Sequence, residues 1–286
     1  MTQHVSKEPP ATPFARLAPN ELTKRVISAM VLGVMAIGAA VGGAWPLAVM
    51  VSIGAIVLAW EWGRLVRNSE FDDTMYVHVA TLLIAIALAA GELMDYALIT
   101  LFCGFVAIAI RRSREYRKLS ALGVLYIGLA AIGVVWLRLD DWGLAAILLI
   151  FACVWAHDTI AMVIGRALGG PRLWPTVSPR KTWSGAVAGL SASMVVASAA
   201  YVFLPNTNLA WLAALGLVLG VAALFGDLAA SSLKRLGRVK NASGLIPGHG
   251  GFLDRLDGAI ASFLIACLIA LSIDAGHPAT ALLQGP

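Results

Sequence analysis

The sequence is dominated by long apolar runs that are separated by short polar stretches. A helix needs about 20 predominantly apolar residues to cross the hydrocarbon core of a bilayer, and most of these runs approach that length. The pattern predicts nine membrane-spanning helices, at residues 26–43, 44–60, 77–91, 94–110, 120–137, 143–165, 183–204, 209–229 and 256–274. We therefore expect an all-α, polytopic membrane protein.

The composition supports this interpretation. Of the 286 residues, 59% are hydrophobic and only 13% are charged, whereas an ordinary soluble domain has roughly 25% charged residues. The three cysteines lie inside apolar runs at unrelated positions, so they indicate neither a disulfide framework nor a metal-binding motif.

Positive charge is distributed unevenly across the predicted membrane. The chain has 21 Lys and Arg residues, and all of them except Arg138 fall on one side of the nine-span arrangement. Because Lys and Arg accumulate in cytoplasmic loops, we expect the N-terminus in the cytoplasm and the C-terminus outside.

The loop lengths suggest three parts of the chain. Residues 1–22 are expected to form a flexible, polar cytoplasmic tail, and residues 23–140 to form N-terminal transmembrane helices that serve packing and lipid contact. Residues 141–286 contain the two long cytoplasmic loops, 166–182 and 230–255. We expect any chemistry to lie in this C-terminal region.

A basic stretch at residues 111–118, RRSREYRK, and the net charge of +5 raise the question of nucleic-acid binding. The stretch directly adjoins a predicted span and has a single aromatic residue. Basic segments in this position usually attract anionic lipid headgroups. We therefore expect membrane lipid, and no nucleic acid, as the partner of this segment.

Charged residues inside spans are costly and usually functional, and two aspartates lie near the cytoplasmic ends of predicted spans. These are Asp158 and Asp227. If the predicted span 209–229 continues as a helix beyond its end, Ser231, Lys234 and Arg235 lie on the same face as Asp227. This polar helix face predicts one of two things. It is either a functional site or an amphipathic end of the helix at the membrane surface, where Asp227 pairs with a lysine and Lys234 reaches towards the headgroups.

The segment IPGHGGFLDRLDG, residues 246–258, follows in the same loop. Its glycines allow the unusual backbone angles with which amide groups can approach an anion closely. A helix that begins near Phe252 places Asp254 and Asp257 on one face, with Arg255 pointing elsewhere. Acidic residues also favour a helix start, but that effect accounts for only part of this pattern.

Together these residues predict a site for magnesium and polyphosphate. Asp227, Asp254 and Asp257 meet if the last two predicted spans pack side by side, and Mg²⁺ binds a few carboxylates together with water and substrate phosphate oxygens. The basic side chains around such a site are Lys234, Arg235, Arg238, Lys240 and His249.

The other long loop has two hydroxyl groups and a cation immediately before a predicted span, on Ser178, Lys181 and Thr182. This loop is either part of the site or an interfacial loop that Trp174 and Trp183 anchor in the headgroup region.

Three segments carry a resemblance to a known family. The first comprises Asp158, Thr159, Gly165 and Arg166, and the second comprises Ser178, Pro179, Lys181, Thr182 and Trp183. The third comprises Gly226, Asp227, Ser231, Lys234, Arg235, Lys240, Pro247, His249, Gly250, Gly251, Asp254, Arg255 and Asp257. Because these residues occur in the order of the family signature, residues 150–260 resemble the phosphatidate cytidylyltransferase family, also called CDP-diacylglycerol synthases. Two positions depart from the family pattern, because Asn241 replaces an acidic residue and Ser184 stands where glutamate is common.

The resemblance implies an enzyme of phospholipid biosynthesis that converts CTP and phosphatidate into CDP-diacylglycerol and pyrophosphate. It implies a homodimer in a bacterial inner membrane, with the active site facing the cytoplasm, and Mg²⁺ as cofactor with a second cation possible. The expected catalytic residues are Asp227, Lys234, Arg235, His249, Asp254 and Asp257, and the expected metal ligands are Asp227, Asp254 and Asp257. The expected substrate-binding residues are Asp158, Ser178, Lys181, Thr182, Ser231, Lys240, Asn241, Gly250, Gly251 and Arg255.

Two other functions fit parts of the pattern. A CTP-dependent polyprenol or phytol kinase would release CDP instead of pyrophosphate. A transporter or lipid-binding scaffold would place its polar residues near the middle of the membrane, often in repeated halves, whereas here they cluster at one face.

Overall fold

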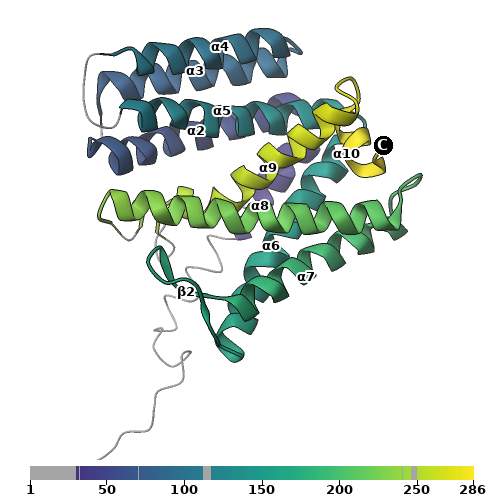
Figure 1. Cartoon of the computed structure of the whole chain (residues 1–286). Coiled ribbons are helices and arrows are strands. Elements are labelled where there is room, and N and C mark those ends of the chain that lie inside the picture. Colours follow the sequence, from purple (N-terminus) through teal and green to yellow (C-terminus); the bar gives the residue numbers. More distant parts are fainter. Residues whose placement is uncertain (1–29, 32, 70, 112–116, 240, 246–249) are drawn as a thin grey trace, which may run out of the picture.

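The computed structural model describes residues 30–31, 33–69, 71–111, 117–239, 241–245 and 250–286 (Figure 1). Residues 33–41 form a helix ahead of the labelled elements. These elements are α2 (Ala44–Arg67), α3 (Asp73–Ala90), α4 (Met94–Ala109), α5 (Arg117–Leu139), α6 (Gly143–Ala167), β1 (Arg172–Trp174), β2 (Ser178–Thr182), α7 (Trp183–Ala199), η1 (Ala200–Val202), α8 (Leu209–Leu236), α9 (Leu253–Ile273) and α10 (Pro278–Gln284). The predicted tail, residues 1–22, lies outside the described residues.

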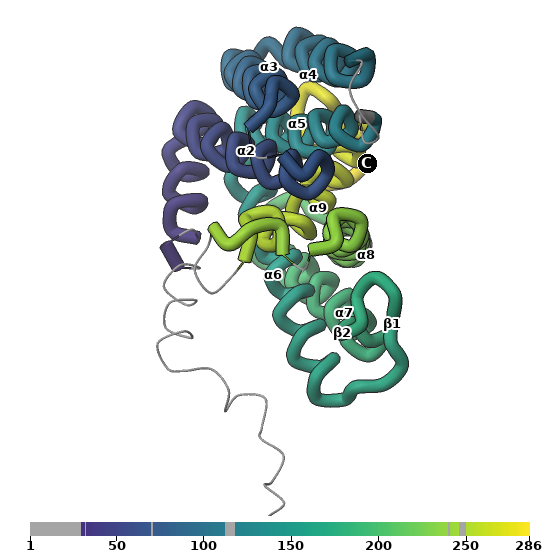
Figure 2. Tube along the Cα trace, turned by 90° about the vertical axis from the view of Figure 1, so that its left-hand side faces the viewer, coloured from purple at the N-terminus to yellow at the C-terminus, as the bar shows by residue number. Residues whose placement is uncertain are grey.

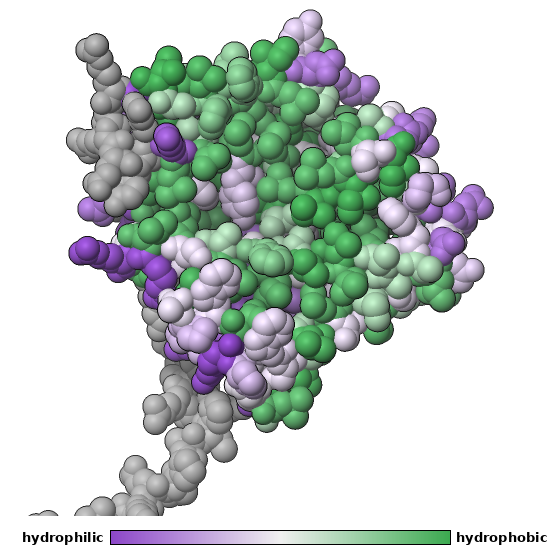
Figure 3. Space-filling view, in the orientation of Figure 1, coloured by the Kyte–Doolittle hydropathy of each residue, from purple (hydrophilic) through white to green (hydrophobic). Residues whose placement is uncertain are grey.

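The helical membrane architecture that the sequence predicts is confirmed. In the part of the chain that the structure describes, seven helices are long and apolar enough to cross a membrane. Figure 3 shows a broad hydrophobic surface between two edges where hydrophilic residues gather. Of the remaining two predicted spans, 94–110 corresponds to α4, which has 16 residues, and 26–43 begins outside the described residues.

Three details of the fold differ from the predicted pattern. Helix α8 continues to Leu236, well beyond the predicted end at residue 229, so that Lys234 and Arg235 lie on the helix. The loop 166–182 contains a small antiparallel hairpin of β1 and β2. After α9, the chain forms one more short helix, α10.

The helices pack in two groups that α8 and α9 connect. Figure 2 shows α3 and α4 at one end of the molecule, and α6, α7 and the hairpin at the other, with α8 and α9 between them. One hydrophobic core lies mainly among α2, α3, α4 and α5, and a second lies among α6, α8, α9 and α10. Leu256 of α9 packs against both cores, so the start of α9 is fixed by both groups of helices.

Side-chain oxygens cap α3 and α8 and fix where these helices begin. Asp72 accepts a hydrogen bond from the Met75 amide at the start of α3, and Asn208 accepts hydrogen bonds from the Ala210 and Trp211 amides at the start of α8. Such caps satisfy amide groups that have no partner within the helix. They explain why both helices begin directly after a short polar turn.

Asp140, in the turn between α5 and α6, is a cap for α10. Its carboxylate accepts hydrogen bonds from the amides of Ala279 and Thr280, at 2.8 and 2.9 Å, and from the Thr280 hydroxyl at 3.1 Å. Asp140 is 9% exposed. The turn and α10 therefore lie against each other at the same end of the molecule.

This contact predicts a measurable effect on stability. Replacing Asp140 with alanine leaves buried amide groups without partners, which should lower the free energy of unfolding by about 1–3 kcal/mol. Thermal unfolding of the purified protein in detergent measures this effect. Asp141→Ala is the matched control, because Asp141 is exposed in the same turn. An equal loss in both variants would contradict the capping role.

Candidate functional site

Two glycines allow the backbones of α8 and α9 to cross in direct contact. A Cβ atom added to Gly226 would come within 2.3 Å of the Asp257 carbonyl oxygen, and one added to Gly258 would lie 3.3 Å from the Ala223 carbonyl oxygen. Each glycine is next in sequence to an aspartate, Asp227 on α8 and Asp257 on α9. The crossing therefore brings these two acidic positions into one neighbourhood.

Asp227 is held by partners from its own helix and from the hairpin. One carboxylate oxygen lies 2.7 Å from the Lys181 Nζ atom of β2. The other accepts a hydrogen bond of 3.2 Å from the Ser231 hydroxyl, one turn further along α8. The structure therefore joins three of the residues that the sequence analysis selected.

Asp257 is buried, with 8% of its surface exposed. One of its carboxylate oxygens accepts a hydrogen bond of 2.8 Å from the amide of Gly258. The Asp257 carboxylate lies within electrostatic range of Asp227, Lys234 and Asp158. It therefore shares one electrostatic environment with the carboxylates and the lysine of the predicted site.

Asp158 belongs to the same neighbourhood but is exposed at the surface of α6. Its carboxylate is within electrostatic range of Asp227, Lys181 and Arg255. Arg255 is exposed on the first turn of α9. The site thus draws charged side chains from α6, the hairpin, α8 and α9.

Asp254 organises the loop that precedes α9. One carboxylate oxygen lies 2.6 Å from the Lys234 Nζ atom, and the other accepts hydrogen bonds of 3.0 Å from the amides of Ala242 and Gly251. The side chains of Asp254 and Lys234 are only 9% and 12% exposed. This pair therefore ties the end of α8 to both sides of the loop.

Two glycines of the loop, Gly250 and Gly251, serve different purposes. Gly250 has a φ angle of +87°, in the left-handed region that glycine adopts without strain. Its Cα is close to Asn241, because an added Cβ would lie 3.5 Å from the Asn241 side chain. At Gly251, an added Cβ would come within 2.8 Å of the Glu61 carboxylate. Lys240 and His249 lie outside the described residues.

The hairpin is fixed to the rest of the site at its turn and at the end of β2. Ser178 begins β2 and pairs with Trp174 of β1. Thr182 is buried and caps α7, because its hydroxyl oxygen accepts a hydrogen bond from the Gly185 amide. Arg235 of α8 donates a hydrogen bond of 3.3 Å to the carbonyl oxygen of Val177. Arg235 therefore supports the hairpin turn from α8.

The acidic side chains around the helix crossing are the candidate ligands for a metal ion. Within the described ranges, no group of three Asp, Glu, His or Cys side chains lies close enough together to hold one. The predicted cluster of Asp227, Asp254 and Asp257 is therefore not assembled here, because Asp254 turns towards Lys234 and the loop amides. Asp227 and Asp257 still fit Mg²⁺, which commonly uses one or two carboxylates and takes its other ligands from water and phosphate.

Glu61 is a polar residue at the site that the sequence analysis missed. It lies on α2, is 0% exposed, and accepts hydrogen bonds from the amides of Phe252 and Leu253 at 2.8 and 2.6 Å. It also accepts a hydrogen bond from the Ser243 hydroxyl. A glutamate in the apolar run LAWEWG is the signal that identifies it, but the predicted span ended one residue earlier.

A cavity of about 500 Å³ opens beside the loop, between the ends of α2 and α8. Its polar lining includes Arg64, Arg67, Arg238, Asn241 and Ser243. Arg67 donates two hydrogen bonds to Asp72, at 2.7 and 2.9 Å. Burial acts to raise the pKa of Asp72, but the Arg67 hydrogen bond, the Met75 amide and the arginine charge together hold the pKa below its usual value.

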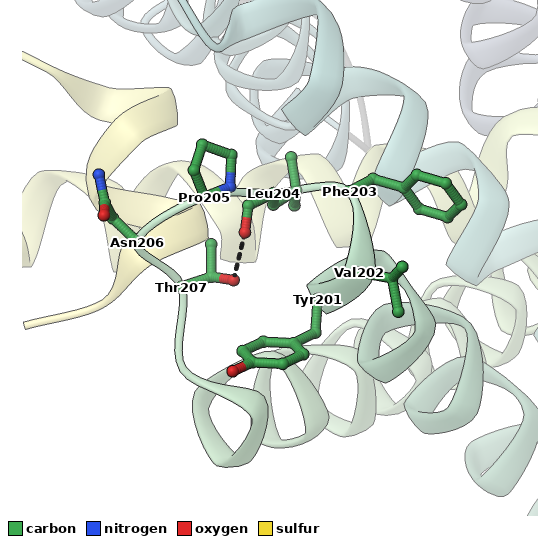
Figure 4. A pocket seen from close by; sticks show the side chains of 7 residues that line it. All are labelled: Tyr201, Val202, Phe203, Leu204, Pro205, Asn206 and Thr207. Atoms are coloured by element: carbon green, nitrogen blue, oxygen red, sulfur yellow. Dashed lines mark hydrogen bonds between the residues drawn. The ribbon is translucent and has the colours of Figure 1, made fainter.

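A second hollow, lined by residues 201–207, lies beyond the other end of α7 (Figure 4). Its lining includes no charged side chain, and the Thr207 hydroxyl donates a hydrogen bond to the Leu204 carbonyl oxygen. Because α7 begins at the hairpin and spans 17 residues, this hollow is roughly 25 Å away. It is not part of the site.

The sequence is similar to the sequences of known proteins. Residues 23–273 match the cytidylyltransferase family. The chain is 34% identical over 251 residues to a phosphatidate cytidylyltransferase from Brucella abortus, and the alignment covers 85% of this chain and 91% of that protein. It is 31% identical over 276 residues to one from Haemophilus influenzae, covering 84% of this chain and 96% of that protein.

Proposed function

This chain belongs to the cytidylyltransferase family, and we propose that it transfers the cytidylyl group of CTP to phosphatidate, giving CDP-diacylglycerol and pyrophosphate. It is thus a nucleotidyltransferase of phospholipid biosynthesis. The observation that carries this proposal is the glycine-mediated crossing of α8 and α9. It places Asp227 and Asp257 together, with Lys181 and Lys234 beside them.

The reaction itself requires little proton transfer. A phosphate oxygen of phosphatidate attacks the α-phosphorus of CTP, a new P–O bond forms, and the bond to the β-phosphate breaks as pyrophosphate leaves. Both substrates are anions, so the main obstacle is charge repulsion. Fixed cations such as Lys181 and Lys234 reduce this repulsion and stabilise the charge that develops on the leaving group.

Asp227 and Asp257 are the residues that would hold Mg²⁺, with Asp254 as the third carboxylate of the proposed set. When bound, Mg²⁺ supplies Lewis-acid stabilisation of phosphate oxygens. A second cation is also part of the proposal. Lys181 pairs with Asp227 and Lys234 pairs with Asp254, which explains how acidic residues remain together at this site.

The proposed roles of the individual residues are those that the family resemblance implies. The proposed catalytic residues are Asp227, Lys234, Arg235, His249, Asp254 and Asp257. The proposed substrate-binding residues are Asp158, Ser178, Lys181, Thr182, Ser231, Lys240, Asn241, Gly250, Gly251 and Arg255. Asn241 borders both the loop and the arginine-lined cavity, which makes that cavity a suitable place for substrate phosphate.

We also propose nine spans with a cytoplasmic N-terminus, an outer C-terminus and a cytoplasmic active site. Two observations support this orientation. Lys and Arg fall almost entirely on one predicted side. In addition, Asp140, in a turn predicted to be outside, contacts the C-terminal helix α10. A homodimer in a bacterial inner membrane, with residues 141–286 as its catalytic region, completes the proposal.

Product analysis tests the reaction. Purified protein in detergent, given phosphatidate, Mg²⁺ and CTP labelled at the α-phosphate, should place the label in CDP-diacylglycerol and release pyrophosphate. Omitting phosphatidate should abolish both products. Formation of CDP and a phosphorylated alcohol from a polyprenol or phytol substrate would contradict the proposal and favour the lipid kinase. A protein that turns over no CTP would favour the transporter or scaffold.

A further inference from the structure

Glu61 lies in a setting where an unpaired carboxylate would be strongly unfavourable. It belongs to α2, a helix that is otherwise apolar around this position, and its surface is completely buried. Burial of an ion is tolerated only when good hydrogen bonds satisfy it. Here these bonds come from Ser243, Phe252 and Leu253, all of which are far from Glu61 in the sequence.

The partners of Glu61 lie on both sides of one loop. Ser243 precedes the glycine-rich segment, whereas Phe252 and Leu253 follow it and begin α9. A carboxylate has two oxygens and can accept several hydrogen bonds, so one side chain can hold both ends together. Glu61 therefore fixes the distance across the loop as well as the start of the helix.

The same loop is also fixed by a residue of the proposed active site, Asp254. The Gly251 amide donates a hydrogen bond to Asp254, while a Cβ on Gly251 would press against Glu61. The Leu253 amide donates a hydrogen bond to Glu61, and Leu253 immediately precedes Asp254 in the sequence. Glu61 and Asp254 thus accept hydrogen bonds from neighbouring amides of one short stretch of backbone.

A second contact from the N-terminal helices reinforces this position. The Tyr126 hydroxyl of α5 donates a hydrogen bond of 3.3 Å to the backbone carbonyl oxygen of Asp257. Tyr126 also stacks at a tilt on Trp62, the residue after Glu61, with ring centroids 5.7 Å apart. The first turns of α9 are therefore held by α2 and α5 as well as by their neighbour α8.

We infer that Glu61 is a positioning residue for the cytidylyl transfer, which sets the place of Asp254 and Asp257 by holding the loop and the first turn of α9 from α2. This inference rests on the proposed function. It extends the active site to the N-terminal helices, which the sequence analysis assigned to packing and lipid contact.

Four variants test the inference. Glu61→Gln keeps the shape but replaces one acceptor oxygen by an NH₂ group that opposes the amide donors. Glu61→Asp keeps the charge on a shorter side chain, and Ser243→Ala removes only the hydroxyl partner. Glu92→Gln is the matched control, because Glu92 is exposed in the turn between α3 and α4. Each protein is assayed in detergent for initial rate at varied CTP and varied Mg²⁺, and for thermal unfolding.

The expected result separates positioning from stability. Displacement of a reacting group by about 1 Å costs roughly 100-fold in rate, so Glu61→Gln should lower kcat by about 10- to 100-fold and raise the Mg²⁺ concentration for half-maximal rate. Glu61→Asp should recover part of kcat. Ser243→Ala should shift the same parameters less, while its unfolding temperature stays near that of the wild type.

Two outcomes would overturn the inference while leaving the function intact. In the first, the wild type is active, and the Glu61→Gln and Ser243→Ala variants have the same kcat and the same Mg²⁺ dependence as the control Glu92→Gln. The other is a loss that appears only in unfolding temperature, with normal kinetics for the folded protein, which would assign Glu61 a purely structural role. Failure of the wild type to form CDP-diacylglycerol would instead reject the proposed function.

Discussion

Replacing Asp254 with asparagine should lower the rate of CDP-diacylglycerol formation by about 100- to 1,000-fold, the range seen when a fixed electrostatic group is removed from an active site. Asp254 joins Lys234 to the loop amides of Ala242 and Gly251. The asparagine variant loses the charge that balances Lys234. It also loses one of the acceptor oxygens that shape the loop.

Stability must be separated from activity in this variant. Removing one partner of a buried ion pair typically costs about 3–5 kcal/mol, because the other charge remains buried. The double variant Asp254→Asn/Lys234→Met removes both charges and should recover much of the lost thermal stability. Its activity should remain as low as that of the single variant.

Asp274→Asn provides the control for Asp254, because Asp274 is exposed at the far end of the same helix. This variant should keep wild-type activity. If the double variant regains activity along with stability, Asp254 has no role beyond pairing with Lys234, and its proposed place among the metal ligands is wrong.

Replacing Asp227 with asparagine should reduce the rate by about 100-fold or more. It should also raise the Mg²⁺ concentration for half-maximal rate by about 10-fold. The reason is that the proposed metal site loses one of its carboxylate charges. The substitution preserves the shape of the side chain next to Gly226, so the close crossing of α8 and α9 remains possible. Initial rates measured over a range of Mg²⁺ concentrations provide this test.

The ion pair between Lys181 and Asp227 offers a second explanation that a double-mutant cycle can separate. If Asp227 serves only to hold Lys181, then Asp227→Asn, Lys181→Met and the double variant should lose equal activity, with unchanged Mg²⁺ dependence. If Asp227 binds the cation, only variants that lack Asp227 should need more Mg²⁺. Lys181→Met should then act mainly on the KM for CTP.

Much of the site could be predicted because its residues are close in the sequence or share a helix face. Asp227 and Ser231 are four residues apart on α8, and the structure joins them by a hydrogen bond. The last two predicted spans do pack side by side, which was the condition for their aspartates to meet, because Gly226 contacts the backbone of Asp257. The metal and substrate roles of these residues stay predictions.

Other features of the site had no local signal. Thr182 is at once a predicted substrate-binding residue and a buried helix cap. Asp254 and Asp257 are three residues apart, yet Asp254 turns to Lys234 and the loop while Asp257 is buried at the helix crossing. Which way each carboxylate turns depends on the partners that packing provides.

The sequence by itself determined the membrane architecture, because lipid acts on each apolar helix separately and forces it to satisfy its own backbone hydrogen bonds. It also determined which polar residues are too costly to be accidental at the membrane surface. Only the tertiary structure decided that Glu61 of α2 holds the start of α9, since that contact joins residues about 190 positions apart. Packing between helices selects such partners, and spacing along the chain does not encode them.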